Sequence, residues 1–201
     1  MMFFRYVVCF FTILSALATN STVLAQAKPS NSKTKVKPLV TTVYLVRHAE
    51  KDTTGHPTDP PLSGVGQVRA VALRQTLLRR QPVALFTTDT KRTRATLAPL
   101  AEALKLEPQV YDPRRGRDLT DRITKDYAGK TVVIVGHSNN VLSLIDDFGA
   151  TPPVEEIADN EYEYLFTVRL VEGLMPTVEV RGYGAERKPD PKGKAAVSTM
   201  K

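Results

Sequence analysis

Two short runs of apolar and β-branched residues place the strongest constraint on how this chain can fold: TTVYLV at 41–46 and TVVIV at 131–135. Runs of this length and composition are typical of strands that are buried on both faces of a parallel sheet. Such a sheet needs helices on both sides, and amphipathic segments at 63–80 and 90–104 can supply them. The pattern therefore predicts an α/β fold, a three-layer α/β/α sandwich around a mostly parallel central sheet.

The rest of the pattern adds one strand between these helices, one helix after the second buried run, and a C-terminal hairpin. The expected bounds are 82–87 for the strand, an end near 148 for the helix, and 164–171 with 177–183 for the hairpin. Ser63 is placed to cap the first helix, and either Ser138 or Asn139 to cap the last. The helix that follows Ser63 has its apolar positions at Val68, Val71, Ala72, Leu73 and Leu77, which are expected on its buried face.

The first 27 residues have the layout of a secretory signal peptide. Arg5 is followed by an apolar stretch from Tyr6 to about Ala18, and an A-x-A site ends at Ala27. We expect cleavage after Ala27 and an exported protein, either periplasmic or secreted. An uncleaved membrane anchor is the alternative, but the apolar run is short for a membrane span. Cleavage removes Cys9, the only cysteine, so that the mature protein has no disulfide.

The formal net charge of +7 lies in the ends of the chain rather than in its middle. Ten of the 28 basic residues fall in the signal peptide, in residues 28–40 and in residues 184–201, which leaves 18 basic against 19 acidic residues between them. We therefore expect a signal peptide at 1–27, a basic flexible linker at 28–40, one folded domain at 41–183 and a basic flexible tail at 184–201. A nearly neutral domain predicts no nucleic-acid partner, and loss of the signal predicts no stable membrane insertion.

Basic and imidazole side chains stand at the carboxyl ends of the predicted strands, where the active sites of open α/β sheets gather. Arg47 and His48 follow the first buried run, and His137 follows the second. Arg92 lies at the start of the helix after the intermediate strand. Phosphoryl transfer needs this combination, because a neutral imidazole can attack phosphorus and guanidinium groups can hold the phosphoryl oxygens. Either histidine alone would more often be structural, but the set together predicts a phosphoryl-transfer site.

Four segments, in this order, resemble the motifs of the histidine phosphatase superfamily in its phosphoglycerate-mutase-like branch (branch 1). They are LVRHAEK at 45–51, PLSGVGQ at 61–67, TDTKRTRAT at 88–96 and VIVGHS at 133–138. The resemblance covers about residues 41–183, the histidine phosphatase domain that it implies. It further implies that His48 is the nucleophile. It also implies that Arg47, Arg92 and His137 hold the phosphoryl group.

The proton donor is where the sequence departs from that family. Many members carry an acidic donor in an insertion between the second helix and the last central strand, whereas residues 105–130 are short and contain no tryptophan. One acid candidate is Glu50, which could instead orient its loop or pair with Lys51. The other is Asp118, which could instead serve a turn or a helix cap. The short insertion predicts a small, lid-poor member whose site admits a bulky or protein-borne phosphate.

These residues predict a metal-independent phosphohydrolase that works through a phosphohistidine on His48. The expected substrate is a phosphoric monoester or a phosphoramidate, carried by a small molecule or by a phosphoprotein. No cofactor is expected, and three histidines with no i,i+4 pair do not make a zinc site. A non-catalytic binder of a phosphate ligand and a phosphomutase are the alternatives, the first because the acid is unassigned.

Overall fold

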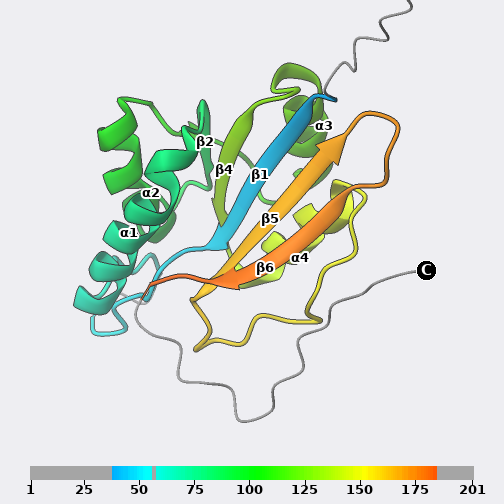
Figure 1. The fold of residues 1–201 in the computed structure, drawn as a ribbon. Helices are drawn as coiled ribbons and strands as arrows, with labels where there is room; N and C mark the ends of the chain where they lie inside the picture. Colours follow the sequence, from blue (N-terminus) through cyan, green and yellow to red (C-terminus); the bar gives the residue numbers. More distant parts are fainter. Residues whose placement is uncertain (1–37, 56–57, 185–201) are drawn as a thin grey trace, which may run out of the picture. The chain divides into compact units, whose positions relative to one another are not determined.

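The computed structural model describes residues 38–55 and 58–184 of the chain (Figure 1). The predicted signal peptide lies outside these residues, as do nearly all of the predicted linker and tail. No helix among the described residues is long and apolar enough to cross a membrane.

The described residues form a six-stranded sheet in the order β3-β2-β4-β1-β5-β6. The parallel strands are β1 (Val40–Arg47), β2 (Ala84–Thr87), β3 (Gln109–Val110) and β4 (Thr131–Gly136). The hairpin strands β5 (Tyr164–Val171) and β6 (Thr177–Gly182) are antiparallel, and β5 pairs antiparallel with β1. The predicted mostly parallel sheet with a C-terminal hairpin is confirmed, and β3 is an addition to it.

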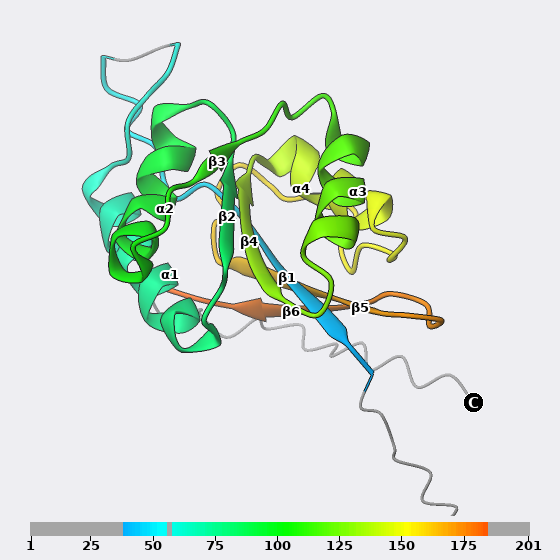
Figure 2. The same ribbon diagram turned by 90° about the horizontal axis from the view of Figure 1, so that it is seen from above.

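Four α-helices of the described region cover the two faces of the parallel part of the sheet (Figure 2). They are α1 (Gly64–Leu77), α2 (Lys91–Leu104), α3 (Gly116–Asp126) and α4 (Ser138–Asp147), and a 3-10 turn (Leu78–Arg80) extends α1. Helices α1 and α2 lie on one face, and α3 and α4 lie on the other. The predicted three-layer α/β/α sandwich is therefore confirmed.

The central strand β4 shows why both faces need a helix layer. Val133 and Val135 belong to the apolar cluster with α1 and α2, whereas Val132 and Ile134 belong to the cluster with α3 and α4. All four side chains are fully buried. Each such burial is worth roughly 1.5–3 kcal/mol, and a one-residue slip of β4 would exchange the two sets between the faces. The register of β4 is therefore strongly specified.

This register brings three strand ends to one level. Arg47 at the end of β1 lies opposite Gly136 of β4, and Thr87 at the end of β2 lies opposite Val135. The His48 N–H continues the ladder by donating to the Gly136 carbonyl at 2.9 Å. The residues directly after β1, β2 and β4 are therefore neighbours at the carboxyl edge of the sheet.

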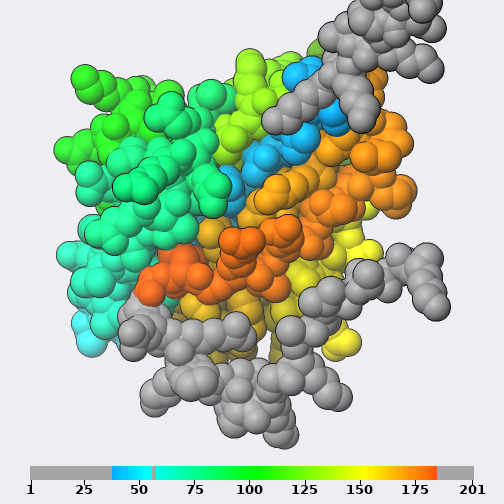
Figure 3. All heavy atoms as spheres, viewed as in Figure 1, coloured from blue at the N-terminus to red at the C-terminus, as the bar shows by residue number. Residues whose placement is uncertain are grey.

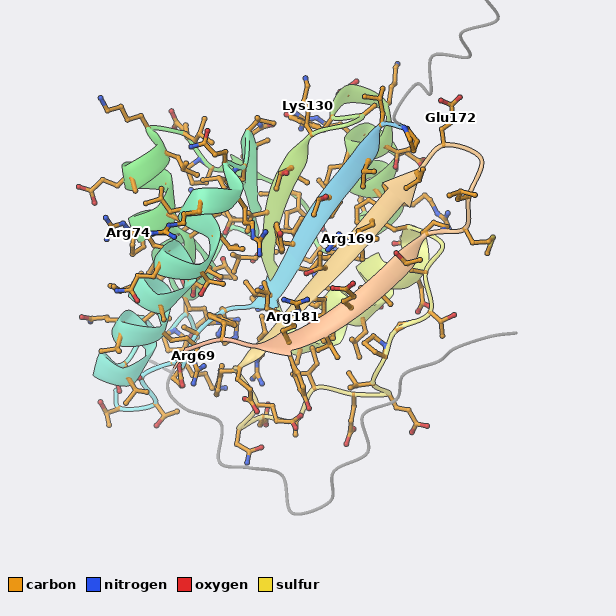
Figure 4. All side chains as sticks on the ribbon, viewed as in Figure 1. Arg69, Arg74, Lys130, Arg169, Glu172 and Arg181 are labelled. Atoms are coloured by element: carbon orange, nitrogen blue, oxygen red, sulfur yellow. The ribbon has the colours of Figure 1, made fainter. Side chains whose placement is uncertain are left out.

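The outer face of the C-terminal hairpin carries charged side chains instead of a helix layer. Figure 3, which has the same view as Figure 1, shows side chains of β5 and β6 at the surface. Arg169 and Arg181 lie on this face (Figure 4), and both pair with Glu179, at 3.7 and 3.4 Å. Exposed ion pairs of this kind add little stability, so the hairpin is held mainly by the apolar side chains on its opposite face.

Helix α1 matches the expected buried face in part, because Leu73 and Leu77 are fully buried as predicted. Val68 and Val71 are 65% and 41% exposed, so the prediction that they are buried was wrong. The buried side of the helix is formed at helical spacing by Gly66, Ala70, Leu73 and Leu77. Ser63 caps the helix as predicted, because its Oγ accepts a hydrogen bond from the Gly66 N–H at 3.1 Å. The small residues on the buried side let α1 approach the loop after β1 closely.

Gly66 marks the closest point of this approach. A Cβ atom at Gly66 would lie 2.2 Å from the Glu50 carbonyl oxygen, which belongs to the backbone and cannot rotate away. We expect Gly66→Ala to lower the free energy of unfolding by about 1–3 kcal/mol, as measured by urea denaturation. Gly64→Ala is the matched control, because a Cβ atom at Gly64 meets nothing within 4 Å. Equal stability of the two variants would contradict the close approach.

Candidate active site

Three side chains meet at the carboxyl edge of the sheet, one from the end of each of β1, β2 and β4. They belong to His48, Thr88 and His137, and the two imidazole ring centroids are 5.4 Å apart. His137 Nε2 is 2.8 Å from Thr88 Oγ1. The structure therefore places the two histidines side by side, as the sequence pattern predicts.

His48 is 4% exposed, and the backbone fixes one of its ring nitrogens. Its Nδ1 is 2.8 Å from the Ala49 carbonyl oxygen, which can only accept, so Nδ1 carries the proton and Nε2 keeps its lone pair. Burial is the main cause that lowers the pKa of His48 to about 3, and Arg92 and Arg47 lower it further. The ring is therefore neutral near pH 7 and has a free nucleophilic nitrogen.

His137 has both ring nitrogens engaged. Arg92 Nη2, which can only donate, lies 3.4 Å from His137 Nδ1, so Nδ1 accepts and Nε2 donates to Thr88. Burial lowers the pKa of His137 to about 4, and Arg92 and Arg47 lower it further. A bound phosphate dianion acts in the opposite direction, because a nearby anion favours the protonated imidazole. His137 can therefore donate from Nδ1 to a phosphoryl oxygen once it has gained a proton there.

Threonines of α2 and of the turn before it hold this arrangement in place. Thr88 Oγ1 donates to Thr93 Oγ1 at 3.0 Å, and Thr93 Oγ1 lies 2.9 Å from the Thr88 carbonyl oxygen. Thr96 Oγ1 accepts a hydrogen bond from the Ala49 N–H at 2.9 Å. These threonines, which the sequence analysis left without a role, fix both the ring of His137 and the loop after β1. The repeated threonines within residues 88–96 were the sequence feature that could have indicated this role.

The start of α4 differs from the prediction. The helix begins at Ser138 with His137 as its N-cap residue, so neither Ser138 nor Asn139 is the cap. The reason is that Asn140 reaches back, with its Oδ1 accepting from the His137 N–H at 2.7 Å. Asn140 Nδ2 in turn donates to Tyr111 Oη at 3.2 Å. The backbone of His137 is thus tied to the segment that follows β3.

Arg47 is 4% exposed and is held by the loop that precedes β5. Its Nη1 donates to the carbonyl oxygens of Ala158 at 2.6 Å and Glu161 at 3.2 Å. Its Nη2 lies 3.4 Å from Asp159 Oδ1, and its Cζ lies 4.3 Å from the ring centroid of Tyr162. The guanidinium group is therefore fixed on one side by a segment more than 100 residues away in the sequence.

Arg92 approaches the histidines from the first turn of α2. Its Nη1 is 3.4 Å from Asp59 Oδ1, and its Nη2 faces His137. Its Nε is buried and has no hydrogen-bond partner among the described residues, and the same holds for the Nε of Arg47. Two buried guanidinium donors next to a neutral imidazole pair make a site for a group with several acceptor oxygens.

The comparison with known proteins agrees with this geometry. Residues 43–114 match the family model of the histidine phosphatase superfamily (branch 1). The match spans less than half of the 201 residues, and within it this chain is similar to that superfamily. Comparison with curated protein sequences gave no match.

Solved structures share the fold of this chain at low sequence identity. A mycobacterial glucosyl-3-phosphoglycerate phosphatase is 15% identical with a TM-score of 0.58, and the match covers 73% of this chain and 100% of the other. The protein histidine phosphatase SixA, complexed with tungstate, is 15% identical with a TM-score of 0.55, and the match covers 72% of this chain and 96% of the other. At this identity the likeness shows the fold alone.

Two residues beside the candidate site were not predicted from the sequence. Asp59 contacts Arg92 and also accepts from the Lys91 N–H at the start of α2, at 3.2 Å. Tyr162 lies against Arg47 and has its ring centroid 6.0 Å from that of His48. Asp59 lies directly before Pro60, and Tyr162 lies two residues before β5 begins at Tyr164. Both positions were weak signals, because loop residues carry no periodicity that shows where their side chains point.

Neither acid candidate from the sequence contacts the two histidines. Glu50 is bound by Arg69 of α1, whose Nε and Nη2 lie 2.9 and 2.7 Å from its carboxylate. Arg69, marked in Figure 4, also donates to the Tyr183 carbonyl at 2.9 Å. Glu50 therefore orients its loop and pairs with Arg69, and the alternative pairing with Lys51 was wrong. Asp118, in the first turn of α3, is exposed and pairs with Arg115.

Proposed function

We propose that this protein is a phosphohydrolase that transfers a phosphoryl group to His48 and then to water. The observation that carries the proposal is the free Nε2 of a buried, neutral His48 beside two arginines with unpartnered Nε donors. A buried donor left without a partner costs about 1–3 kcal/mol, and phosphoryl oxygens are suitable acceptors for both. The family-model match over residues 43–114 and the fold shared with two phosphatases support phosphatase activity.

The geometry supports a two-step reaction with one covalent intermediate. His48 Nε2 attacks phosphorus, and the bond from phosphorus to the leaving oxygen or nitrogen breaks with its electron pair on the leaving group, which takes up a proton. Arg47 and Arg92 balance the charge on the phosphoryl oxygens. Water then attacks the phosphoramidate, the phosphorus–nitrogen bond breaks, and His48 returns to its neutral form with orthophosphate as product.

The substrate and setting complete the proposal. We propose a phosphoric monoester or phosphoramidate on a small molecule or a phosphoprotein, turned over without a metal or other cofactor by an exported, periplasmic or secreted protein. Nucleic acid and a membrane-embedded state are not part of the proposal. In residues 38–55 and 58–184, no group of three or more metal-ligating side chains could hold an ion. The two phosphatases of similar fold act, by their names, on glucosyl-3-phosphoglycerate and on phosphorylated histidine of proteins, and both substrate classes belong in the first panel.

The test is to trap the intermediate. The full chain is mixed with a substrate in the presence of EDTA, quenched in alkali, and digested for mass spectrometry. We expect an acid-labile phosphate on His48, and oxygen from isotope-labelled water in the released orthophosphate. Tight phosphate binding without turnover across the panel would favour the non-catalytic binder. Transfer to a second hydroxyl with no label in orthophosphate would favour the phosphomutase.

For the missing acid, we propose Asp112. Tyr111 still donates its N–H to Thr87 of β2 at 2.9 Å, so the chain leaves the sheet only after Tyr111 and Asp112 follows at the carboxyl edge. Hydrogen bonds from Arg114 lower the pKa of Asp112 to about 2, which keeps this carboxyl ionised in the free protein. To act as the acid, Asp112 has to gain a proton when the substrate binds, and a nearby phosphate dianion raises its pKa in that direction.

Substitution of Asp112 is expected to show a dependence on the leaving group. Asp112→Asn should lower kcat for alkyl phosphates by about 100-fold. It should change kcat little for aryl phosphates, because their leaving groups depart without a proton. The measurement is kcat across a series of phosphate esters with increasing leaving-group pKa. Asp118→Asn tests the other aspartate in the same series, and a leaving-group-dependent loss there instead would assign the acid to Asp118.

A further inference from the structure

We propose that Tyr162 and the carbonyl groups of Ala158 and Glu161 form a clamp that decides which edge of Arg47 faces the phosphoryl group. The proposal rests on the proposed function, because it assigns Arg47 to the phosphate. Tyr162 acts through Arg47 and is therefore a positioning residue. It does not touch the reacting atoms.

The hydrogen bonds of Arg47 occupy one of its nitrogens fully and leave the other two with few partners. Nη1 has two N–H groups and two acceptors, Ala158 O at 2.6 Å and Glu161 O at 3.2 Å, so this nitrogen is fully used. The Tyr162 ring lies over the guanidinium plane, with 4.3 Å between Cζ and the ring centroid. Nε has no partner among the described residues, and Nη2 contacts Asp159 at 3.4 Å. The edge formed by Nε and Nη2 is therefore the one left for a ligand.

This edge suits a phosphoryl group. Nε and Nη2 point two parallel N–H groups in the same direction and can reach two oxygens of one phosphoryl group. The same edge is already used elsewhere in this chain, where Nε and Nη2 of Arg69 bind the Glu50 carboxylate. Asp159 is 96% exposed, so its contact with Arg47 is weak in water and a phosphate dianion can replace it.

Tyr162 is the part of the clamp that substitution can test. The two carbonyl groups belong to the backbone, whereas the ring can be removed or kept. Contacts between a guanidinium and an aromatic face change binding by a few-fold to more than tenfold, depending on burial. Because Arg47 is almost fully buried, we expect the upper part of that range. The ring also lies near His48, so an effect on the nucleophile has to be separated from an effect on Arg47.

The experiment is a double-mutant cycle on the full chain with orthophosphate as the probe, measured by calorimetry. Tyr162→Leu is expected to weaken orthophosphate binding by about tenfold. Tyr162→Phe keeps the ring face and should recover most of the affinity. In the Arg47→Ala background, Tyr162→Leu should weaken binding no further. In turnover assays the loss from Tyr162→Leu should appear mainly in KM, because the nucleophile is intact.

The controls separate the clamp from the proposed function and from general destabilisation. Tyr127→Leu removes a ring that lies 5.8 Å from Lys130 Nζ, and should leave orthophosphate binding unchanged. Unchanged binding in Arg47→Ala would overturn the assignment of Arg47 in the proposed function. Weaker binding in Arg47→Ala with unchanged binding in Tyr162→Leu, or independent losses that add in the double variant, would overturn the clamp alone.

A second measurement applies should Tyr162→Leu fail to fold. The Arg47 Nε–H resonance of the unaltered chain is expected to shift in NMR spectra on addition of orthophosphate, because this donor gains its acceptor. A resonance that stays in place while orthophosphate binds would show that the phosphate uses another edge. That result would overturn the clamp.

Discussion

Replacement of His48 by alanine is expected to lower kcat/KM for a phosphate ester by about four orders of magnitude or more, and to remove the phosphoenzyme. The reason is that no second nucleophile is available in the described site. His137 has its Nε2 hydrogen-bonded to Thr88 and its Nδ1 occupied by Arg92. The measurement combines steady-state rates on an aryl phosphate with mass spectrometry of the alkaline-quenched protein.

His137→Ala is the matched control for this prediction, because it removes an imidazole from the same site. It should slow turnover by weakening transition-state binding, yet still allow phosphate to be trapped on His48. Thermal unfolding of both variants shows whether either loss comes from the fold. Phosphoenzyme in His48→Ala, or an acid-labile phosphate recovered from another residue, would contradict the assignment of the nucleophile.

The two histidines were predictable because strand ends are local features of a sequence. Residues 41–46 and 131–135 could each be identified as buried strands from composition alone. Parallel strands bring their carboxyl ends to one edge of the sheet, so His48 and His137 were expected at the same edge. The register that pairs Arg47 with Gly136 makes them neighbours.

The groups that hold the arginines were not predictable in the same way. Arg47 and Ala158 are separated by 111 residues, and Arg92 and Asp59 by 33. Both contacts are made by loops, whose path follows from tertiary packing and leaves no periodic pattern. A sequence can show that an arginine is present beside a nucleophile, but not which of its donors are already occupied.

Helix α3 and the exposed valines of α1 show the limits of apolar periodicity. The buried residues of α3 are Leu119, Thr120 and Ile123, so only two apolar positions mark this helix among charged neighbours. Val68 and Val71 are the opposite case, because they are apolar and yet face outward. In α1 the close approach to the loop after β1 selects small residues for part of the buried side, and apolar character alone placed Val68 and Val71 on the wrong face.

The second large effect is expected in acid, where the two histidines should make the fold sensitive to pH. Burial lowers the pKa of His48 to about 3 and that of His137 to about 4, whereas an unfolded histidine titrates near 6.5. Below pH 6.5 the unfolded chain therefore binds protons that the folded chain does not. The free energy of unfolding should fall with pH by up to about 1.4 kcal/mol per pH unit for each histidine, until the folded-state pKa is reached.

Comparison with His48→Asn isolates the contribution of His48, the proposed nucleophile. Aspartates and glutamates titrate alike in both proteins and cancel, so the unaltered chain should lose about 2 kcal/mol more than the variant between pH 7.5 and pH 5. Urea denaturation at the two pH values gives this difference, and NMR titration of the His48 ring should show no protonation at pH 5. A His48 resonance that titrates near 6.5, or an equal loss in both proteins, would contradict a buried, neutral nucleophile. The burial that frees Nε2 for attack would then be absent, because the same desolvation both keeps His48 unprotonated and makes the folded state sensitive to acid.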